Sequence, residues 1–248
     1  MLAAHSHLHV QSPCKATSVI EPVEMPKHPS YLTNLSYKKS NKMLPFQLKN
    51  NIRHYDFKTT WHYLQELGRQ KYGPKFTLYK TDKILIYKLL IYFIRDEENC
   101  KIHNIDLDKG ILLNGPIGCG KTTLMNLMKH FVYSNHNYII KSASDVAIEF
   151  NNIGYPTITK YGKSEKIYCF DDLGIENNIK HYGNECNTIA EIILSRYDLQ
   201  IYGGLITHAT TNLNAEELEK LYGNRVRSRL RSMFNLIAFN RDAVDKRK

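Results

Sequence analysis

Short apolar runs alternate with stretches of helical periodicity from about residue 109 onward. The first run, Ile111-Leu112-Leu113, is typical of a buried strand in a parallel sheet. Four later runs have the same character, and apolar residues recur at helical spacing between them. The predicted strands are 111–113, 138–140, 166–170, 204–208 and 234–239, and the predicted helices are 122–132, 143–151, 187–197 and 214–223. This alternation predicts an α/β fold with a mainly parallel five-stranded sheet and helices on both faces.

The earlier part of the chain has a different pattern. Residues 1–55 are poor in hydrophobic periodicity and contain five of the eight prolines, so we expect a disordered or loosely attached basic segment. Residues 56–79 are predicted to form a helical linker, because apolar residues have helical spacing from 56 to 70. The main domain is expected to span residues 80–248 and to begin with a helix at 80–97.

The loop after the first predicted strand carries a complete phosphate-binding pattern. Residues 115–122 match G-x-x-x-x-G-K-[ST], and they lie where this pattern functions, between a strand and a helix. The glycines let backbone N–H groups point at phosphate oxygens, and the N-terminus of the following helix favours an anion. The alternative, a glycine-rich turn without a ligand, leaves this context unexplained. The predicted nucleotide-binding residues are Gly115, Pro116, Ile117, Gly118, Cys119, Gly120, Lys121, Thr122 and Thr123.

Two residues of this loop also have chemical roles in the prediction. Lys121 places a positive charge on the β- and γ-phosphates of ATP, and the hydroxyl of Thr122 can ligate Mg²⁺. The loop therefore predicts ATP and Mg²⁺ as ligands.

Two adjacent carboxylates follow another apolar strand. Asp171 is predicted to hold Mg²⁺, and Asp172 is predicted to orient and deprotonate the attacking water. The simpler alternative is that the pair serves only as a helix cap and a turn.

Asn212 and a series of arginines that begins at Arg225 are further candidates for the catalytic set. Asn212 follows the predicted strand 204–208 and is expected to position the hydrolytic water, although asparagine is also a common turn former. Arg225 opens a series of arginines at alternate positions, which continues through Arg227, Arg229 and Arg231. On a helix this spacing spreads the side chains over more than one face, so one of them is free to reach a neighbour's nucleotide while others contact DNA or solvent.

The charge distribution favours an anionic partner. The chain has a formal net charge of +10, and the basic residues concentrate at its two ends. Between residues 225 and 248, eight basic residues face two acidic ones. Such ends indicate single-stranded DNA or DNA as a partner, and a solvated basic surface without a partner is the alternative.

Cysteine usage and hydropathy bear on the compartment. The five cysteines are odd in number and include no C-x-x-C pair, so we expect neither a disulfide framework nor a zinc site. We also expect no membrane association, because no apolar run approaches the roughly 20 residues of a membrane span. These features favour a cytoplasmic protein.

Four motifs in one order resemble a known family. The loop at 115–122 is followed by Phe170-Asp171-Asp172-Leu173-Gly174, by Thr210-Thr211-Asn212-Leu213, and by Tyr222-Gly223-Asn224-Arg225-Val226-Arg227-Ser228-Arg229-Leu230. The series resembles the DnaC-like helicase loaders and IstB-like transposition ATPases of the AAA+ class of P-loop NTPases. The resemblance covers about residues 80–248.

The resemblance implies the strand order 5-1-4-3-2, a homo-oligomer formed on ATP or DNA binding, and ATP held between subunits. It implies that Asn212 is sensor 1 and that Arg225 is an arginine finger. It also implies loading of a replicative helicase, or alternatively assistance to a transposase. A P-loop kinase of small molecules, or a module that uses ATP only as a structural switch, is a competing function of a different class.

The chain departs from the family pattern in three places. The acid after Asp171 is Asp172, where the family frequently has Glu. Only nine residues follow Phe239, so no sizeable C-terminal lid domain is expected, and Arg247 is the candidate for a sensor-2 arginine. Residues 1–80 match nothing in the family.

Overall fold

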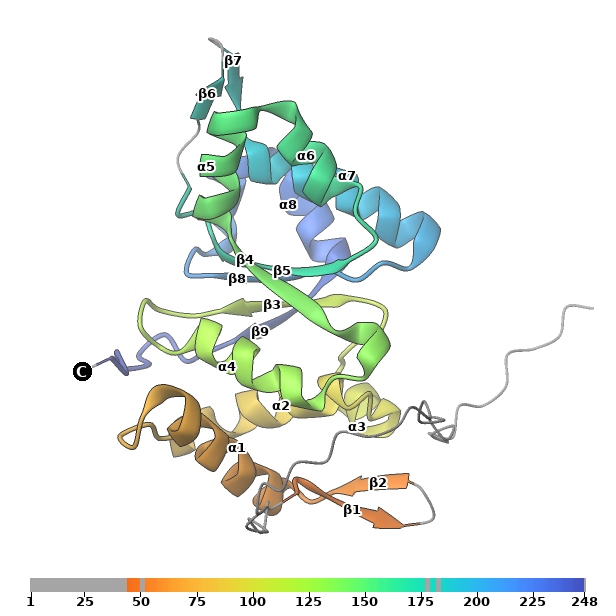
Figure 1. Cartoon of the computed structure of the whole chain (residues 1–248), viewed down its shortest axis with the longest axis vertical. Coiled ribbons are helices and arrows are strands. Elements are labelled where there is room, and N and C mark those ends of the chain that lie inside the picture. Colours follow the sequence, from red (N-terminus) through yellow and green to blue (C-terminus); the bar gives the residue numbers. More distant parts are fainter. Residues whose placement is uncertain (1–43, 50–51, 177–178, 182–183, 248) are drawn as a thin grey trace, which may run out of the picture. The chain divides into compact units, whose positions relative to one another are not determined.

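The structure is a computed structural model that describes residues 44–49, 52–176, 179–181 and 184–247. Two compact units divide the chain, Met1–Phe76 and Thr77–Lys248 (Figure 1).

The first unit contains a hairpin and a helix. Strands β1 (Phe46–Lys49) and β2 (Ile52–Tyr55) pair antiparallel, and the rings of Phe46 and Tyr55 lie 5.6 Å apart across the pair. Helix α1 (Phe57–Tyr72) begins where the Asp56 carboxylate accepts the N–H of Thr59 at 2.7 Å. The cross-strand aromatic pair stabilises these two strands, which lie within the segment that was expected to be disordered or loosely attached. Residues 1–43 lie outside the described part of the chain.

Strands and helices alternate through the second unit. In chain order, with η for 3-10 helices, they are η1 (Lys80–Asp82), α2 (Lys83–Phe93), α3 (Glu97–Ile102), β3 (Gly110–Asn114), α4 (Lys121–Met128), η2 (Lys129–Phe131), η3 (Ser134–His136), β4 (Tyr138–Ser142), α5 (Ala143–Ile153), α6 (Tyr155–Gly162), β5 (Ile167–Leu173), β6 (Ile179–His181), β7 (Asn184–Cys186), α7 (Thr188–Gly203), β8 (His208–Thr211), α8 (Ala215–Met233) and β9 (Phe234–Ala238).

Five of these strands form one sheet, in the order β4-β5-β8-β3-β9 with every pairing parallel. If only these five strands are numbered in chain order, the sheet reads 5-1-4-3-2 from the β9 edge. The labels differ from these numbers because β1, β2, β6 and β7 lie outside the sheet. Helices α5, α6, α7 and α8 cover one face, and α2 and α4 cover the other (Figure 1). The predicted α/β fold class is confirmed.

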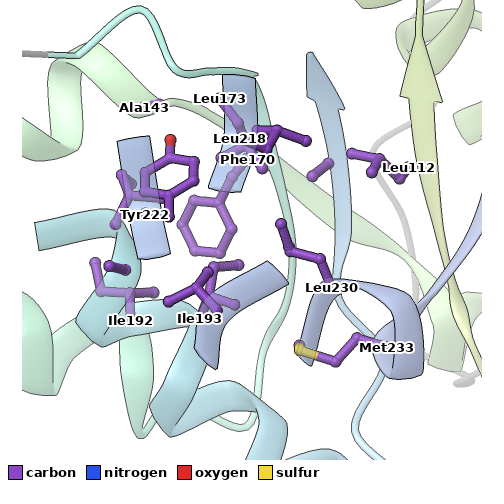
Figure 2. Close-up of a cluster of buried hydrophobic side chains, with 14 of the residues drawn as sticks. Leu112, Ala143, Phe170, Leu173, Ile192, Ile193, Leu218, Tyr222, Leu230 and Met233 are labelled. Carbon is purple, nitrogen blue, oxygen red and sulfur yellow. The ribbon is translucent and has the colours of Figure 1, made fainter. Parts of the chain in front are cut away.

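The main core lies between the sheet and the helices α5 to α8 (Figure 2). Its centre is Phe170 of β5, which is fully buried and lies near Ile192 and Ile193 of α7. Burying an aliphatic or aromatic side chain of this size contributes about 1.5–3 kcal/mol. Packing of this kind fixes the carboxyl ends of β3, β5 and β8, where the predicted site residues lie.

Helix α8 begins as predicted and is interrupted at Gly223. Asn214 and Glu217 form a capping box, with the Asn214 side chain accepting the N–H of Glu217 at 2.9 Å. Gly223 has the non-helical backbone angles φ 83° and ψ 163°, so the first helical segment of α8 ends there, as predicted, and a second segment continues beyond the kink to Met233. Val226 and Leu230 of the second segment are buried and form an apolar stripe.

The last but one strand also lies further along than predicted. Strand β8 starts at His208, whereas the sequence predicted 204–208. The preceding helix α7 extends to Gly203 and ends at Gly204, which has the left-handed conformation of a helix cap. The chain therefore leaves the helix only after Gly204 and joins the sheet later, at His208.

The segment after β9 has neither helix nor strand between Phe239 and Arg247. Among the described residues no helix has the length and apolar character needed to cross a membrane.

Candidate nucleotide-binding site

The glycine-rich loop connects β3 to α4, as the pattern requires. Gly118 has φ 80° and Gly120 has φ 96°, a region that L-residues with a Cβ rarely adopt. Gly120 is the N-cap of α4, so Lys121 and Thr122 occupy the first turn, where the helix dipole favours an anion. The loop therefore has the conformation that a phosphate-binding backbone needs.

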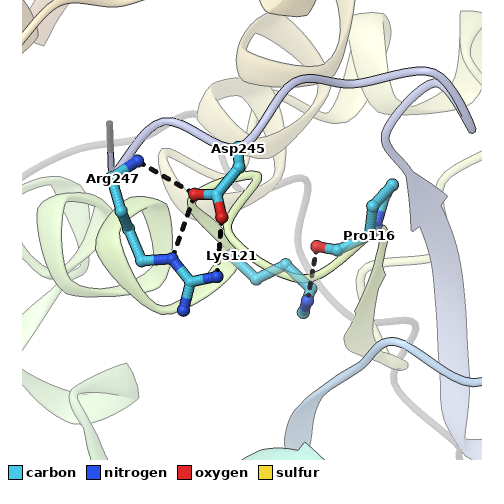
Figure 3. A network of polar contacts seen from close by, with 4 residues as sticks. All are labelled: Pro116, Lys121, Asp245 and Arg247. Carbon is cyan, nitrogen blue, oxygen red and sulfur yellow. Dashed lines mark hydrogen bonds and ion pairs between the residues drawn. The ribbon is translucent and has the colours of Figure 1, made fainter.

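Lys121 is folded along this loop (Figure 3). Its ammonium donates to the backbone oxygens of Gly115 at 2.9 Å and Pro116 at 3.1 Å, and the residue is only 6% exposed. A buried ammonium held by two carbonyl oxygens is fixed close to the loop that it would serve.

Thr122 and Asp171 meet directly, although 49 positions separate them. The Thr122 hydroxyl lies 2.7 Å and 3.0 Å from the two carboxylate oxygens of Asp171. The hydroxyl of Thr210 donates to the same carboxylate at 2.7 Å. Hydroxyl and carboxylate oxygens beside a phosphate loop are the ligand set that Mg²⁺ prefers, so the residues fit this ion.

Asp172 has an unusual backbone. Its φ is 57°, the register between β5 and β8 shifts at this point, and its N–H donates to Thr210 at 2.8 Å. Burial, followed by the neighbouring charge of Asp171, raises the pKa of Asp172, while Lys121 and Arg247 act in the opposite direction. A strained, half-buried acid with a raised pKa is characteristic of functional sites.

The structure does not bring Asn212 and Arg225 into this cluster. Asn212 is exposed just beyond β8, and with the other described residues it makes no hydrogen bond. Arg225 is exposed on α8 and has no ion pair within the described part of the chain. Among the described acids, Glu219 pairs with Arg227 and not with Arg225.

Sequence reasoning missed two features of the site. Thr210 contacts both predicted acids, and its only signal was a position two residues before Asn212 on a strand next to β5. The other feature is the segment after β9, which contacts the loop through Lys246. Nothing in the local sequence predicted that contact.

No protein-family model matches the chain, and no curated protein matches it. Several solved structures are similar to it. The crystal structure of the DnaC helicase loader has a TM-score of 0.43 at 20% identity, with 60% of this chain and 91% of that chain covered. For a putative primosome component from Streptococcus pyogenes serotype M3 the TM-score is 0.49 at 17% identity, over 69% and 86% of the two chains. For the crystal structure of DnaI the TM-score is 0.48 at 18% identity, with 67% of this chain and 89% of that chain covered.

Proposed function

We propose that this chain is an AAA+ ATPase that binds ATP with Mg²⁺ at residues 115–123 and hydrolyses it to ADP and phosphate. The observation that carries the proposal is the contact of Thr122 with Asp171. It joins the phosphate loop of β3–α4 to the acid at the end of β5, and these are the two halves that a P-loop hydrolase needs.

Each residue has a role that follows from its position. Lys121 binds the β- and γ-phosphates. Thr122 with Asp171 would hold the Mg²⁺ ion, which would supply positive charge to the phosphates. Asp172 orients the attacking water and accepts its proton, because its raised pKa makes it a stronger base than an ordinary aspartate. Thr210 keeps the two acids in place through its contacts with both.

We further propose that the ATPase acts with DNA and a protein partner as a DnaC-like loader of a replicative helicase. The support is the series of four motifs in one order, together with the excess of basic residues from 225 to 248. Charge of this kind binds phosphates with little sequence preference, as single-stranded DNA requires.

One experiment separates this function from its competitors. ATP hydrolysis is measured with and without single-stranded DNA, with Lys121→Ala as the control that removes nucleotide binding. A loader hydrolyses ATP and responds to DNA, a small-molecule kinase ignores DNA, and a structural switch binds ATP without turnover. A pull-down that recovers a transposase in place of a replicative helicase would replace the loader by the transposition helper.

Arg225 is proposed to act in trans on a neighbouring subunit's nucleotide. It lies with Asn224, Ser228 and Arg229 around an open hollow on α8, and its guanidinium is unpaired among the described residues. A permanent charge with a planar fork suits contact with phosphate oxygens. The site therefore needs a homo-oligomer for full activity.

Arg225→Ala is expected to bind ATP normally and to lose hydrolysis by about 10³- to 10⁵-fold, as for other arginine fingers. Arg231→Ala, which removes an exposed arginine of the same helix, is the matched control and should keep its activity. Mixing Arg225→Ala with Lys121→Ala protein should restore part of the turnover, because one interface then combines an intact loop with an intact finger. A mixture without recovered activity would contradict a role in trans.

A further inference from the structure

The residues after β9 cross the phosphate loop, and we call residues 240–247 the C-terminal strap. The backbone N–H of Lys246 donates to the backbone oxygen of Gly118 at 3.0 Å. The Lys246 ammonium donates to the backbone oxygen of Cys119 at 2.7 Å. The strap therefore contacts the middle of the loop through backbone and side chain alike.

A carboxylate and two aromatic rings surround the Lys246 ammonium. Its ammonium forms an ion pair with Asp82 at the start of α2, a residue that is only 5% exposed. The rings of Tyr79 and Phe239 lie 5.1 Å and 4.7 Å from the same nitrogen. A largely buried carboxylate requires a partner, so this pair commits the strap to one position.

Asp245, which precedes Lys246, places a carboxylate beside the loop. The carboxylate of Asp245 lies so close to Gly118 that a Cβ built there would come within 2.2 Å of its oxygen. Arg247 binds this carboxylate through two nitrogens, at 3.0 Å and 2.8 Å (Figure 3). An anion of the chain itself thus stands against the loop whose backbone would receive the anionic phosphates.

We propose that the C-terminal strap is an autoinhibitory latch of the nucleotide site. With the strap in this position, the carboxylate of Asp245 competes with phosphates for the loop, and nucleotide binding requires the strap to move. The pair between Lys246 and Asp82 sets how firmly the latch is closed. The inference rests on the proposed nucleotide-binding function and adds a form of regulation to it.

The consequence is measurable because a closed latch lowers the apparent affinity in proportion to the fraction that is open. If the open form is about one tenth of the population, opening the latch fully raises the affinity about tenfold. The direction of the change in affinity separates the latch from a simple charge effect. Loss of the lysine charge near the loop would by itself weaken the binding of an anion, whereas opening the latch strengthens it.

The test is a titration of the full chain with a fluorescent ATP analogue and Mg²⁺. Lys246→Ala breaks the ion pair, and Asp245→Asn removes the competing charge while leaving that pair intact. We expect both variants to bind the analogue several-fold to about tenfold more tightly than the parent chain. The matched control is Arg241→Ala, which removes an exposed positive charge from the same strap. The Arg241 side chain forms no hydrogen bond or ion pair with the other described residues, so the affinity of this variant should not rise.

The outcomes separate the latch from the function on which it rests. Unchanged or weaker binding by both variants, with binding by the parent chain, would overturn the latch and leave the nucleotide site standing. A parent chain that binds no nucleotide, and behaves like Lys121→Ala, would overturn both. Tighter binding by Arg241→Ala as well would show that the gain does not depend on the pair between Lys246 and Asp82 or on Asp245, and would contradict the latch.

Discussion

Strands β5 and β8 carry buried charge at both ends, and the two ends are built in opposite ways. At the amino end, Arg196 of α7 is fully buried beside the residues that precede the strands. At the carboxyl end, Asp171 and Asp172 are adjacent, and Asp171 contacts Thr122 in the first turn of α4. The same pair of strands therefore allows a direct comparison of a structural charge with a charge whose proposed role is functional.

The arginine at the amino end has all its hydrogen-bonding capacity directed at fixed acceptors. It donates to the hydroxyl of Thr207 at 2.6 Å and to the backbone oxygens of Tyr161 and Lys166 at 2.9 Å each, with longer contacts to two further carbonyl oxygens. Burial lowers its pKa to about 10, so the guanidinium remains charged at neutral pH. A satisfied buried charge of this kind ties a helix to a sheet.

At the carboxyl end the hydroxyls of Thr122 and Thr210 satisfy the carboxylate of Asp171, whereas the carboxylate of Asp172 accepts no hydrogen bond from the other described residues. Two like charges are adjacent, one residue has a left-handed backbone, and burial raises the pKa of Asp172. Such an arrangement costs stability and is retained where chemistry needs it. The comparison teaches that burial alone does not mark a functional charge, and that a half-buried charge without a hydrogen-bond partner, as at Asp172, is the better candidate.

Arg196→Met should have the largest effect on stability. It removes several charge-assisted hydrogen bonds and leaves their carbonyl partners buried, so the free energy of unfolding should fall by about 3–5 kcal/mol. Urea unfolding followed by circular dichroism measures the change. Arg196→Lys keeps the charge without the planar fork and should recover only part of it. If the free energy of unfolding falls by less than about 1 kcal/mol, the guanidinium does not stabilise the contact between helix α7 and the sheet as we describe.

A matched pair of substitutions sharpens the comparison. Thr207→Val and Thr210→Val delete one hydroxyl each, at opposite ends of the same two strands. Thr207→Val removes the shortest hydrogen bond of Arg196 and should lower the free energy of unfolding by about 1.5–3 kcal/mol. ATP turnover per folded molecule should stay normal.

Thr210→Val should do the reverse. It frees the carboxylate of Asp171 and the N–H of Asp172, so ATP turnover should fall by about tenfold while stability changes less. Parallel unfolding and hydrolysis measurements on the two variants decide the matter. Equal effects of both variants on both quantities would erase the distinction between the ends.

Asp172→Asn should produce the smallest change in stability, and the change should be a gain. Because the folded state raises the pKa of Asp172 above its ordinary 3.8, the ionised carboxylate costs stability at neutral pH. The variant should be more stable at pH 7 by on the order of 0.5 kcal/mol. The gain should shrink as the pH falls through the folded-state pKa, where the parent carboxyl becomes protonated. Thermal unfolding at several pH values tests the sign, and a variant that is less stable at pH 7 would contradict the account.

The fold and the phosphate loop were predictable because both depend on local sequence. The loop pattern spans eight residues, and apolar runs mark the strands on either side of β8, so Thr122 and Asp171 could be placed at one sheet edge before any contact was known. The hydrophobic pattern also located several helices and the break at Gly223, but it ended α7 too early and so placed β8 too early.

The remaining features depend on contacts between distant residues and carry no local signal. Arg196 has the position of an ordinary helix residue, and only the fold shows that it is buried. Thr210 resembles any β-branched strand residue until its neighbour β5 is known. Lys246 reaches Cys119 across 127 positions, which no periodicity reports.

The measurement that tests the central claim most directly compares ATP binding and ATP hydrolysis in Asp172→Asn protein. The claim is that Asp172 activates water while Lys121, Thr122 and Asp171 bind the nucleotide and its metal ion. The account predicts affinity close to that of the parent chain and a fall in turnover of about 10²- to 10⁴-fold, the contribution of a general base. Turnover at the parent rate would contradict the assignment of the base, and loss of binding together with turnover would contradict the division of roles.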